Sequence, residues 1–121
     1  ERARRGRKLL GGGMRQVGVL GAPGMIALKE MSKRLIEDHE NAQYLANELN
    51  KLEEFEVDMK RLDINMVFVD STIEFKLLAE HLKQFDIIIG GYKNNSIRLA
   101  CHNDIKRQDI DFFIEKVKEY L

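Results

Sequence analysis

The sequence predicts an α+β fold, in which a small, mostly antiparallel sheet of three or four strands packs against helices and follows two or three amino-terminal helices. Apolar residues recur at helical spacing over residues 35–52, 74–84 and 105–121. Between these segments lie short runs rich in β-branched residues, which have the length of strands. Only a short glycine- and asparagine-rich loop separates two of the runs, so at least one strand pair is antiparallel, and this favours α+β over a doubly wound sheet.

Two helices are expected before the first of these segments. Residues 2–10 are good helix formers and are followed by Gly11, the first of three glycines, which end a helix because glycine loses most freedom on becoming helical. Residues 14–31 again repeat apolar residues at helical spacing. Pro23 interrupts this second run and is expected to kink or restart the helix.

The clearest amphipathic helix follows, with Ser32 as its expected cap and an apolar stripe over residues 35–52. Its opposite face, which includes Asp38, is expected to meet water. His39 lies on or beside the stripe, so we expect it to serve packing rather than to bind a ligand.

The remaining elements alternate between strands and helices. The segment 87–89 and the strand that follows it are expected to form a hairpin, with Ile89 opposite Ile97 and a turn at Asn94-Asn95. Asp104 is expected to cap the last helix. His81, on the preceding helix, is expected to face solvent. The strand signals are weak at residues 55–59, strong at 66–69, and present at 87–89 and 96–102.

The composition is that of a globular protein, with 44% apolar and 33% charged residues. Its longest apolar stretches are far shorter than the roughly 20 residues of a membrane span, so no membrane partner is expected. The single cysteine, Cys101, excludes an internal disulfide and offers no metal-binding spacing. We therefore expect a reducing, cytoplasmic location and no metal site.

Positive charge is concentrated at the amino-terminal end. The formal net charge is zero, but residues 1–16 carry six cations and one anion, so the remainder of the chain is acidic. Residues 7–16 read Arg-Lys-Leu-Leu-Gly-Gly-Gly-Met-Arg-Gln, in which glycine amides and a following helix start predict a phosphate or carboxylate contact with Lys8 and Arg15. The alternative is a flexible turn with a solvated basic face, because this is not a P-loop and no strand precedes it.

This run resembles the signature of the low-specificity threonine aldolases, pyridoxal-phosphate enzymes of the aspartate aminotransferase fold type. In that family an arginine-rich helix leads into Lys-x-x-Gly-Gly-Gly-Met-Arg-Gln, and a later segment is similar to Arg34-Leu-Ile-Glu-Asp-His-Glu-Asn-Ala42. Asn65-Met-Val67 looks like the family's Thr-Asn-Met strand, and Ile97-Arg-Leu-Ala-Cys-His102 like its Val-Arg-Leu-Val-Thr-His strand. The resemblance spans nearly the whole chain, in the correct order.

The chain departs from the family pattern in three places. Gly6 replaces a bulky residue, Gly-Ala-Pro-Gly at residues 21–24 replaces an alanine-rich turn, and Cys101 stands where threonine is usual. The first two departures put the continuity of the amino-terminal helices in doubt.

The resemblance implies a division of the chain. Residues 1–32 would be a basic helix, a glycine-rich hinge and a connecting helix from a large domain, and residues 33–121 the carboxyl-terminal small domain of a fold-type-I enzyme. The chain is then expected to begin in mid-protein, within a homotetrameric parent.

The resemblance also implies site residues. Arg98 would bind the carboxylate of an amino-acid substrate, a task suited to the guanidinium fork; from the residues alone, a surface ion pair is the alternative. Lys8 and Arg15 would lie near the phosphate of pyridoxal 5'-phosphate, in a neighbouring subunit. His102 would support the strand that bears Arg98 rather than transfer protons.

The implied activity is the cleavage of L-threonine or L-allo-threonine to glycine and acetaldehyde. No lysine in this chain stands in the family's Schiff-base context, so the chain alone is expected to be inactive. Two other interpretations stay open. One is a non-catalytic module whose basic helix binds an acidic protein or nucleic acid, although no tryptophan or aromatic interleaving supports nucleic-acid binding. The other is a related pyridoxal-phosphate lyase or transaminase.

Overall fold

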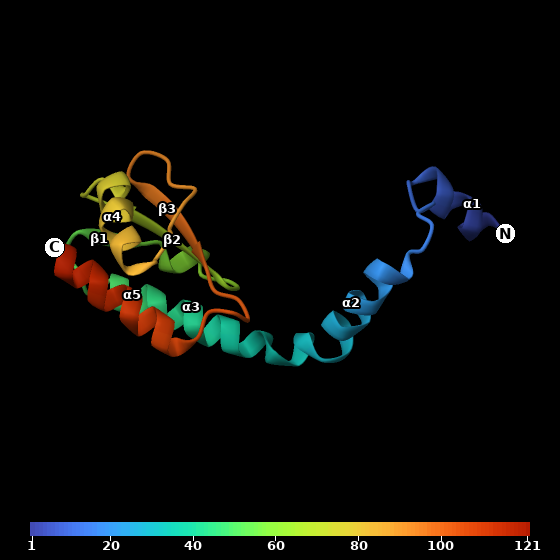
Figure 1. The fold of residues 1–121 in the computed structure, drawn as a ribbon, viewed down its shortest axis with the longest axis horizontal. Helices are drawn as coiled ribbons and strands as arrows, with labels where there is room; N and C mark the ends of the chain where they lie inside the picture. Colours follow the sequence, from blue (N-terminus) through green and yellow to red (C-terminus); the bar gives the residue numbers. More distant parts are fainter. The chain divides into compact units, whose positions relative to one another are not determined.

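The computed structural model describes all residues 1–121, which fall into two compact units, Glu1–Arg34 and Leu35–Leu121. Figure 1 colours the chain from the amino terminus to the carboxyl terminus. None of its helices combines the length and the apolar character that a membrane crossing requires.

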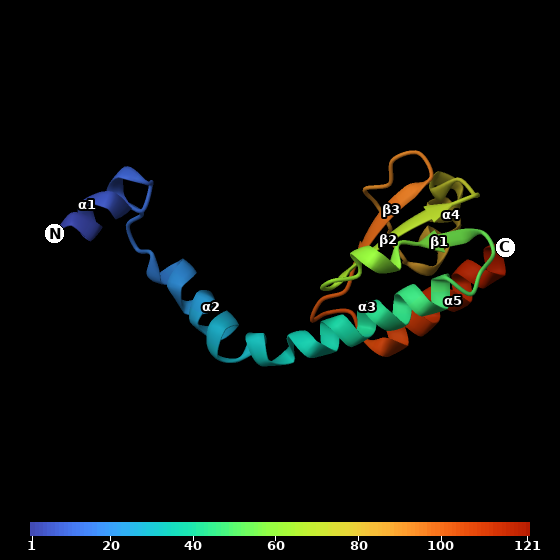
Figure 2. The ribbon, with the colours of Figure 1, turned by 180° about the vertical axis from the view of Figure 1, so that it is seen from behind.

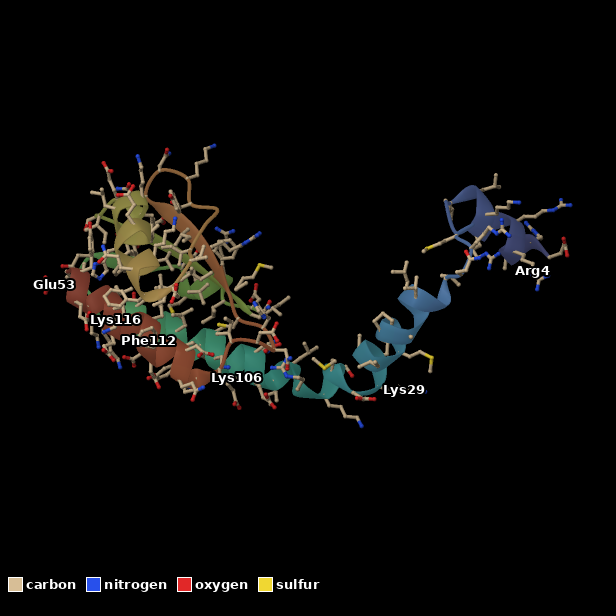
Figure 3. The ribbon with its side chains drawn as sticks, in the orientation of Figure 1. Arg4, Lys29, Glu53, Lys106, Phe112 and Lys116 are labelled. Atoms are coloured by element: carbon tan, nitrogen blue, oxygen red, sulfur yellow. The ribbon has the colours of Figure 1, made fainter.

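The first unit consists of the helices α1 (Arg2–Leu9) and α2 (Gly18–Lys29), followed by the 3-10 turn η1 (Met31–Arg34). None of these elements has a buried side chain. Arg4 on α1 and Lys29 at the end of α2 both project away from their helices (Figure 3). The helix α2 continues through Pro23 instead of restarting there. A proline inside a helix removes one backbone hydrogen bond, and the bonds on either side keep the helix intact.

The three glycines after α1 form its carboxyl-terminal cap. Gly11 has a left-handed backbone, with φ +85°. The Gly12 N–H donates to the carbonyl of Arg7 at 2.8 Å, and the Gly11 N–H donates to that of Lys8 at 3.2 Å. This pair of bonds is the Schellman motif, which satisfies the last carbonyls of a helix. A Cβ atom on Gly12 would lie only 2.7 Å from the Arg7 carbonyl oxygen, so both positions require glycine.

The second unit is an α+β domain with a three-stranded antiparallel sheet in the order β1-β2-β3, as the sequence predicts. The helices α3 and α5 lie side by side along this unit in both ribbon views (Figures 1 and 2). Its elements are α3 (Leu35–Leu49), β1 (Phe55–Val57), the 3-10 turn η2 (Met59–Arg61), β2 (Met66–Ser71), α4 (Phe75–Leu82), the 3-10 turn η3 (Lys83–Phe85), β3 (Ser96–Ala100) and α5 (Arg107–Tyr120).

One face of the sheet is buried and the other is open. Val69 pairs with Val57 on one side and with Ile97 on the other, and all three side chains are buried in a single core with residues of α3, α4 and α5. Because successive side chains of a strand point to opposite faces, Phe68 and Arg98 belong to the other face. The strands therefore present one face to the helices and leave the other face open.

The structure does not confirm the hairpin expected between residues 87–89 and 96–102. Residues 87–89 form no strand, and Ile97 pairs with Val69 of β2. Ile87 and Ile89 are half-buried while Ile88 is exposed, so the alternating pattern is real. Such a pattern reports which side chains are buried, and it does not require that the backbone pair with a neighbouring strand. The expected turn at Asn94-Asn95 is present, enclosed by an isolated bridge between Lys93 and Ser96.

Two expected helix caps are wrong. The hydroxyl of Ser32 donates to the carbonyl of Leu28 at 2.8 Å, so it completes the preceding helix. The helix α5 begins three residues after Asp104, and its first free N–H, that of Lys106, donates to Oδ2 of Asp109 at 2.8 Å. A carboxylate in the first turn satisfies the same backbone group that a preceding side chain would have satisfied.

The inward face of α3 also differs from the expectation. Asp38 is buried, whereas Leu35, Ile36 and His39 are exposed. Asp38 shares its helix face with Ala42, because residues four apart lie one above the other. At the start of the helix, the sequence therefore predicted the wrong buried face, one that includes Leu35 and Ile36 in place of Asp38.

Candidate functional site

The two basic residues of the glycine signature lie in the first unit. Lys8 is in the last turn of α1, Arg15 is in a turn at residues 15–17, and both are exposed. The N–H groups of Gly11 and Gly12 bond inside the cap, and that of Gly13 donates to the Gly11 carbonyl at 2.9 Å. The glycine amides therefore do not face a ligand, contrary to the expectation. The helix start is also displaced, because α2 begins only at Gly18. Any anion contact here comes from the side chains of Lys8 and Arg15.

Arg98 lies in the second unit, at the centre of β3. It is exposed on the open face of the sheet, directly opposite Phe68 of β2. The surface ion pair that was the alternative for this residue is absent, since no carboxylate lies within salt-bridge distance of its guanidinium. A planar fork of donors is thus free to bind a carboxylate from outside the chain.

Two clefts meet at Arg98. The first, which we name the edge cleft, has a volume of about 560 Å³ and is lined by residues 85–90, by residues 98–102 and by side chains of α5 that are apolar except for Asp109. Phe112 of α5, labelled in Figure 3, is one of these side chains. The second, the face cleft, has a volume of about 410 Å³ and lies on the open face between Arg61, Phe68 and Arg98. Arg98 is the only charged residue common to both.

The end of the strand that bears Arg98 is held by asparagines. The Asn65 side-chain amide donates to the Cys101 carbonyl at 2.6 Å, and the Cys101 N–H donates to the Asn65 carbonyl at 2.8 Å. Farther on, the Asn41 side chain donates to the Ile105 carbonyl at 3.2 Å. Both asparagines belong to the family-like segments of the sequence, but their role could not be read there, because each contact joins residues distant in the chain.

Cys101 is structural. It is 1% exposed, and burial raises the pKa of its thiol to about 11; the charge of Asp38 adds to this rise, and that of Arg107 opposes it. A thiol that stays protonated near neutral pH is a poor nucleophile. The neighbouring His102 is exposed, and its Nδ1 accepts a hydrogen bond from the Asp104 N–H, so its ring is not paired with the buried thiol.

The histidines serve structure or lie at the surface. His102 lines the edge cleft, and its Nδ1 accepts a hydrogen bond from the Asp104 N–H at 3.3 Å. His81 does not face solvent as expected, because it is half-buried, with Nε2 3.1 Å from the Lys116 carbonyl oxygen. No group of three potential metal ligands occurs in the structure.

Comparison with known proteins gives this arrangement a context. The sequence model of one family, described as beta-eliminating lyase, matches residues 1–72, more than half of the chain. The chain belongs to the beta-eliminating lyase family. Its resemblance to the low-specificity threonine aldolases is also confirmed by individual relatives in that group.

The matched relatives include a plant protein and a bacterial protein. This beta-eliminating lyase chain is 35% identical over 116 residues to low-specificity L-threonine aldolase 1 of Arabidopsis thaliana, covering 93% of the chain. It is 41% identical over 111 residues to the low specificity L-threonine aldolase of Escherichia coli O157:H7, covering 91% of the chain. In both comparisons it spans 32% of the relative's length.

Proposed function

We propose that this chain contributes the carboxyl-terminal part of a pyridoxal-phosphate-dependent threonine aldolase, and that Arg98 binds the α-carboxylate of the substrate. The observation that carries the proposal is the unpaired guanidinium of Arg98, exposed where two clefts meet, on a strand whose end is fixed by Asn65. Two relatives are named low-specificity L-threonine aldolases, and for the intact protein we propose the cleavage of L-threonine or L-allo-threonine to glycine and acetaldehyde.

The role of Arg98 is to orient the substrate. A guanidinium fork that holds the carboxylate by two parallel hydrogen bonds fixes the direction of the Cα substituents. The bond between Cα and Cβ must be aligned before it can break, so this positioning contributes directly to the rate. When bound, pyridoxal phosphate supplies the electron sink for the cleavage.

Lys8 and Arg15 would hold the phosphate of that cofactor. Both are exposed cations, and a dianionic phosphate suits two such charges. The first unit also exposes apolar side chains, including Leu9 and Leu10. Their exposure supports the proposal that this unit packs against other protein surface, as it would in a homotetramer. The assignment is therefore to a cofactor phosphate bound by side chains alone.

The test is to measure threonine cleavage in the intact aldolase that carries this chain. Arg98→Gln is expected to lower kcat/KM for threonine by about 30-fold or more, the loss that corresponds to roughly 2 kcal/mol for a hydrogen bond to a charged group. Arg107→Gln is the matched control, because that guanidinium stacks on Tyr44 with Cζ 3.9 Å from the ring centroid, outside both clefts. An unchanged kcat/KM in Arg98→Gln would show that the assignment is wrong.

The same assay separates the aldolase from a related lyase. The proposal predicts that the intact protein converts threonine to glycine and acetaldehyde. It also predicts no turnover by residues 1–121 alone with added pyridoxal phosphate. Elimination products in place of glycine would favour the related lyase.

A further inference from the structure

A second arginine lies on the open face of the sheet. The guanidinium of Arg61 stacks on the Phe68 ring, with Cζ 3.8 Å from the ring centroid. The turn η2 is held in place for this contact, because the Asp58 N–H donates to the Phe68 carbonyl at 3.0 Å and Oδ1 of Asp58 accepts from the Lys60 N–H at 3.2 Å. Stacking fixes the plane of a guanidinium and leaves its N–H donors pointing outward in that plane.

Phe68 links this arginine to Arg98. The two residues are partners in the β2–β3 ladder, and the backbone N–H and C=O of Phe68 point toward β1, as its bond from Asp58 shows. Phe68 and Arg98 are therefore a non-hydrogen-bonded pair, in which the Cβ atoms lie about 4.5–5.5 Å apart. Arg61 stacks on the Phe68 ring, Arg98 is the cross-strand neighbour of Phe68, and both arginines line the face cleft.

The charges of the face cleft favour an anionic ligand. Its lining has three cations, Arg61, Lys93 and Arg98, and two carboxylates, Asp58 and Asp70. Both carboxylates are already engaged, since Asp58 accepts from the Lys60 N–H and Asp70 accepts from the Ser96 hydroxyl. Arg61 has one ion-pair partner, the carboxylate of Asp58, whose Oδ2 lies 3.9 Å from Nε, so the guanidinium keeps further donors for a ligand.

We propose that the face cleft binds a dicarboxylate, with one carboxylate at Arg98 and the second at Arg61. Each guanidinium fork matches one carboxylate group, and the cleft offers two such forks beside one aromatic ring. The inference rests on the proposed role of Arg98. It makes Arg61 a specificity-determining residue, which favours ligands that carry a second acidic group.

The test is an NMR titration of the 121-residue chain at low ionic strength, with succinate as the dicarboxylate and propionate as a monocarboxylate. The wild-type chain is expected to bind succinate about tenfold more tightly than propionate, which corresponds to about 1.4 kcal/mol for the second contact. Arg61→Gln is expected to remove this preference, because it lowers the affinity for succinate far more than the affinity for propionate. Arg98→Gln is expected to weaken the binding of both ligands.

Matched variants decide between the possible outcomes. Arg107→Gln also removes a guanidinium stacked on an aromatic ring, but outside the cleft, and should change neither affinity. Persistence of the preference in Arg61→Gln, or its loss in Lys93→Gln alone, would overturn the proposal and leave the role of Arg98 intact. Unchanged binding of both ligands in Arg98→Gln would instead count against the carboxylate site itself. The amide spectrum of each variant reports whether it is folded.

Discussion

Cys101 follows the strand that carries Arg98, and its chemistry is determined by where the backbone places it. The thiol is buried in the core, and both the N–H and the carbonyl of Cys101 are hydrogen-bonded to Asn65. Burial disfavours a charged thiolate and so raises the pKa to about 11, from an ordinary value of 9.0. A neutral thiol suits the packing that this position requires.

The first prediction concerns the reactivity of this thiol. In the folded chain, Cys101 is expected to react with a disulfide reagent at pH 8 at least about 100-fold more slowly than in the urea-unfolded chain. The folded thiol stays protonated, and its burial keeps the reagent from reaching the sulfur. The reagent's absorbance measures the rate, and Cys101 is the only cysteine, so the stoichiometry is unambiguous. Equal rates in the two states would contradict the prediction.

The raised pKa also gives a direction for the pH dependence of stability. The unfolded thiol loses its proton near pH 9 and the folded one near pH 11, so the folded state binds more protons between these values. The contribution of Cys101 is complete below pH 9 and is lost as the pH rises to 11. In Cys101→Ala, the unfolding free energy should therefore fall less steeply over this interval.

Arg98 and Arg61 show how much of the site the sequence predicted. The sequence makes Arg98 a candidate because a family-like motif surrounds it, whereas its free guanidinium and the clefts beside it follow from the fold. Arg61 lies in no motif. Its position depends on the pairing of Phe68 with Arg98 and on the turn η2, which brings together residues from two strands and a connecting segment. No local pattern carries such information.

At the scale of elements, α4 offers a direct measurement of what holds the second unit together. Leu82 is fully buried in the core, whereas Leu77 on the same helix is 48% exposed. Both residues are leucines on the same helix, and they differ only in how far the fold buries them. Their comparison isolates the contribution of burial.

The corresponding prediction uses urea denaturation of the 121-residue chain. Leu82→Ala is expected to lower the unfolding free energy by about 2–5 kcal/mol, because it removes buried contacts and leaves a cavity. Leu77→Ala, the matched control, should cost less than about 1 kcal/mol. The urea midpoint should fall while the slope of the transition stays constant. Similar losses in the two variants would show that the core does not depend on the inward face of α4.

The elements also show where sequence patterns succeed and fail. The helices α3, α4 and α5 and the strand β2 were predicted because their apolar residues recur with the period of the buried face. The segment 87–89 has a strand-like pattern without a pairing partner. The hydroxyl of Ser32 donates to Leu28 of α2 instead of capping α3, and Asp109 rather than Asp104 caps the start of α5. Periodicity reports burial, whereas pairing and capping depend on which groups meet in space.

The glycine signature is a second such case. Three adjacent glycines predicted amides that approach a ligand, and the structure instead uses them to end α1. Glycine is required at position 11 because its backbone is left-handed, and at position 12 because a Cβ atom would collide with Arg7. Lys8 lies in the last turn of α1, before the capping glycines, and Arg15 lies after them.

For the molecule as a whole, burial is confined to one of the two units. Every buried side chain belongs to Leu35–Leu121, and the first unit has none. In that unit α1 has eight residues and α2 has twelve. Isolated helices shorter than about 12–15 residues are marginal in water, because their nucleation is costly. The stability of the chain should therefore come from the second unit.

The last prediction follows from this distribution. A shortened chain that contains only residues 35–121 is expected to unfold in urea with the midpoint and slope of the 121-residue chain, within about 0.5 kcal/mol of the same unfolding free energy, since the deleted residues bury no apolar side chain. The reciprocal peptide, residues 1–34, should show weak and non-cooperative helical circular dichroism. A loss of more than about 1 kcal/mol in the shortened chain would mean that the first unit stabilises the core by interactions other than burial.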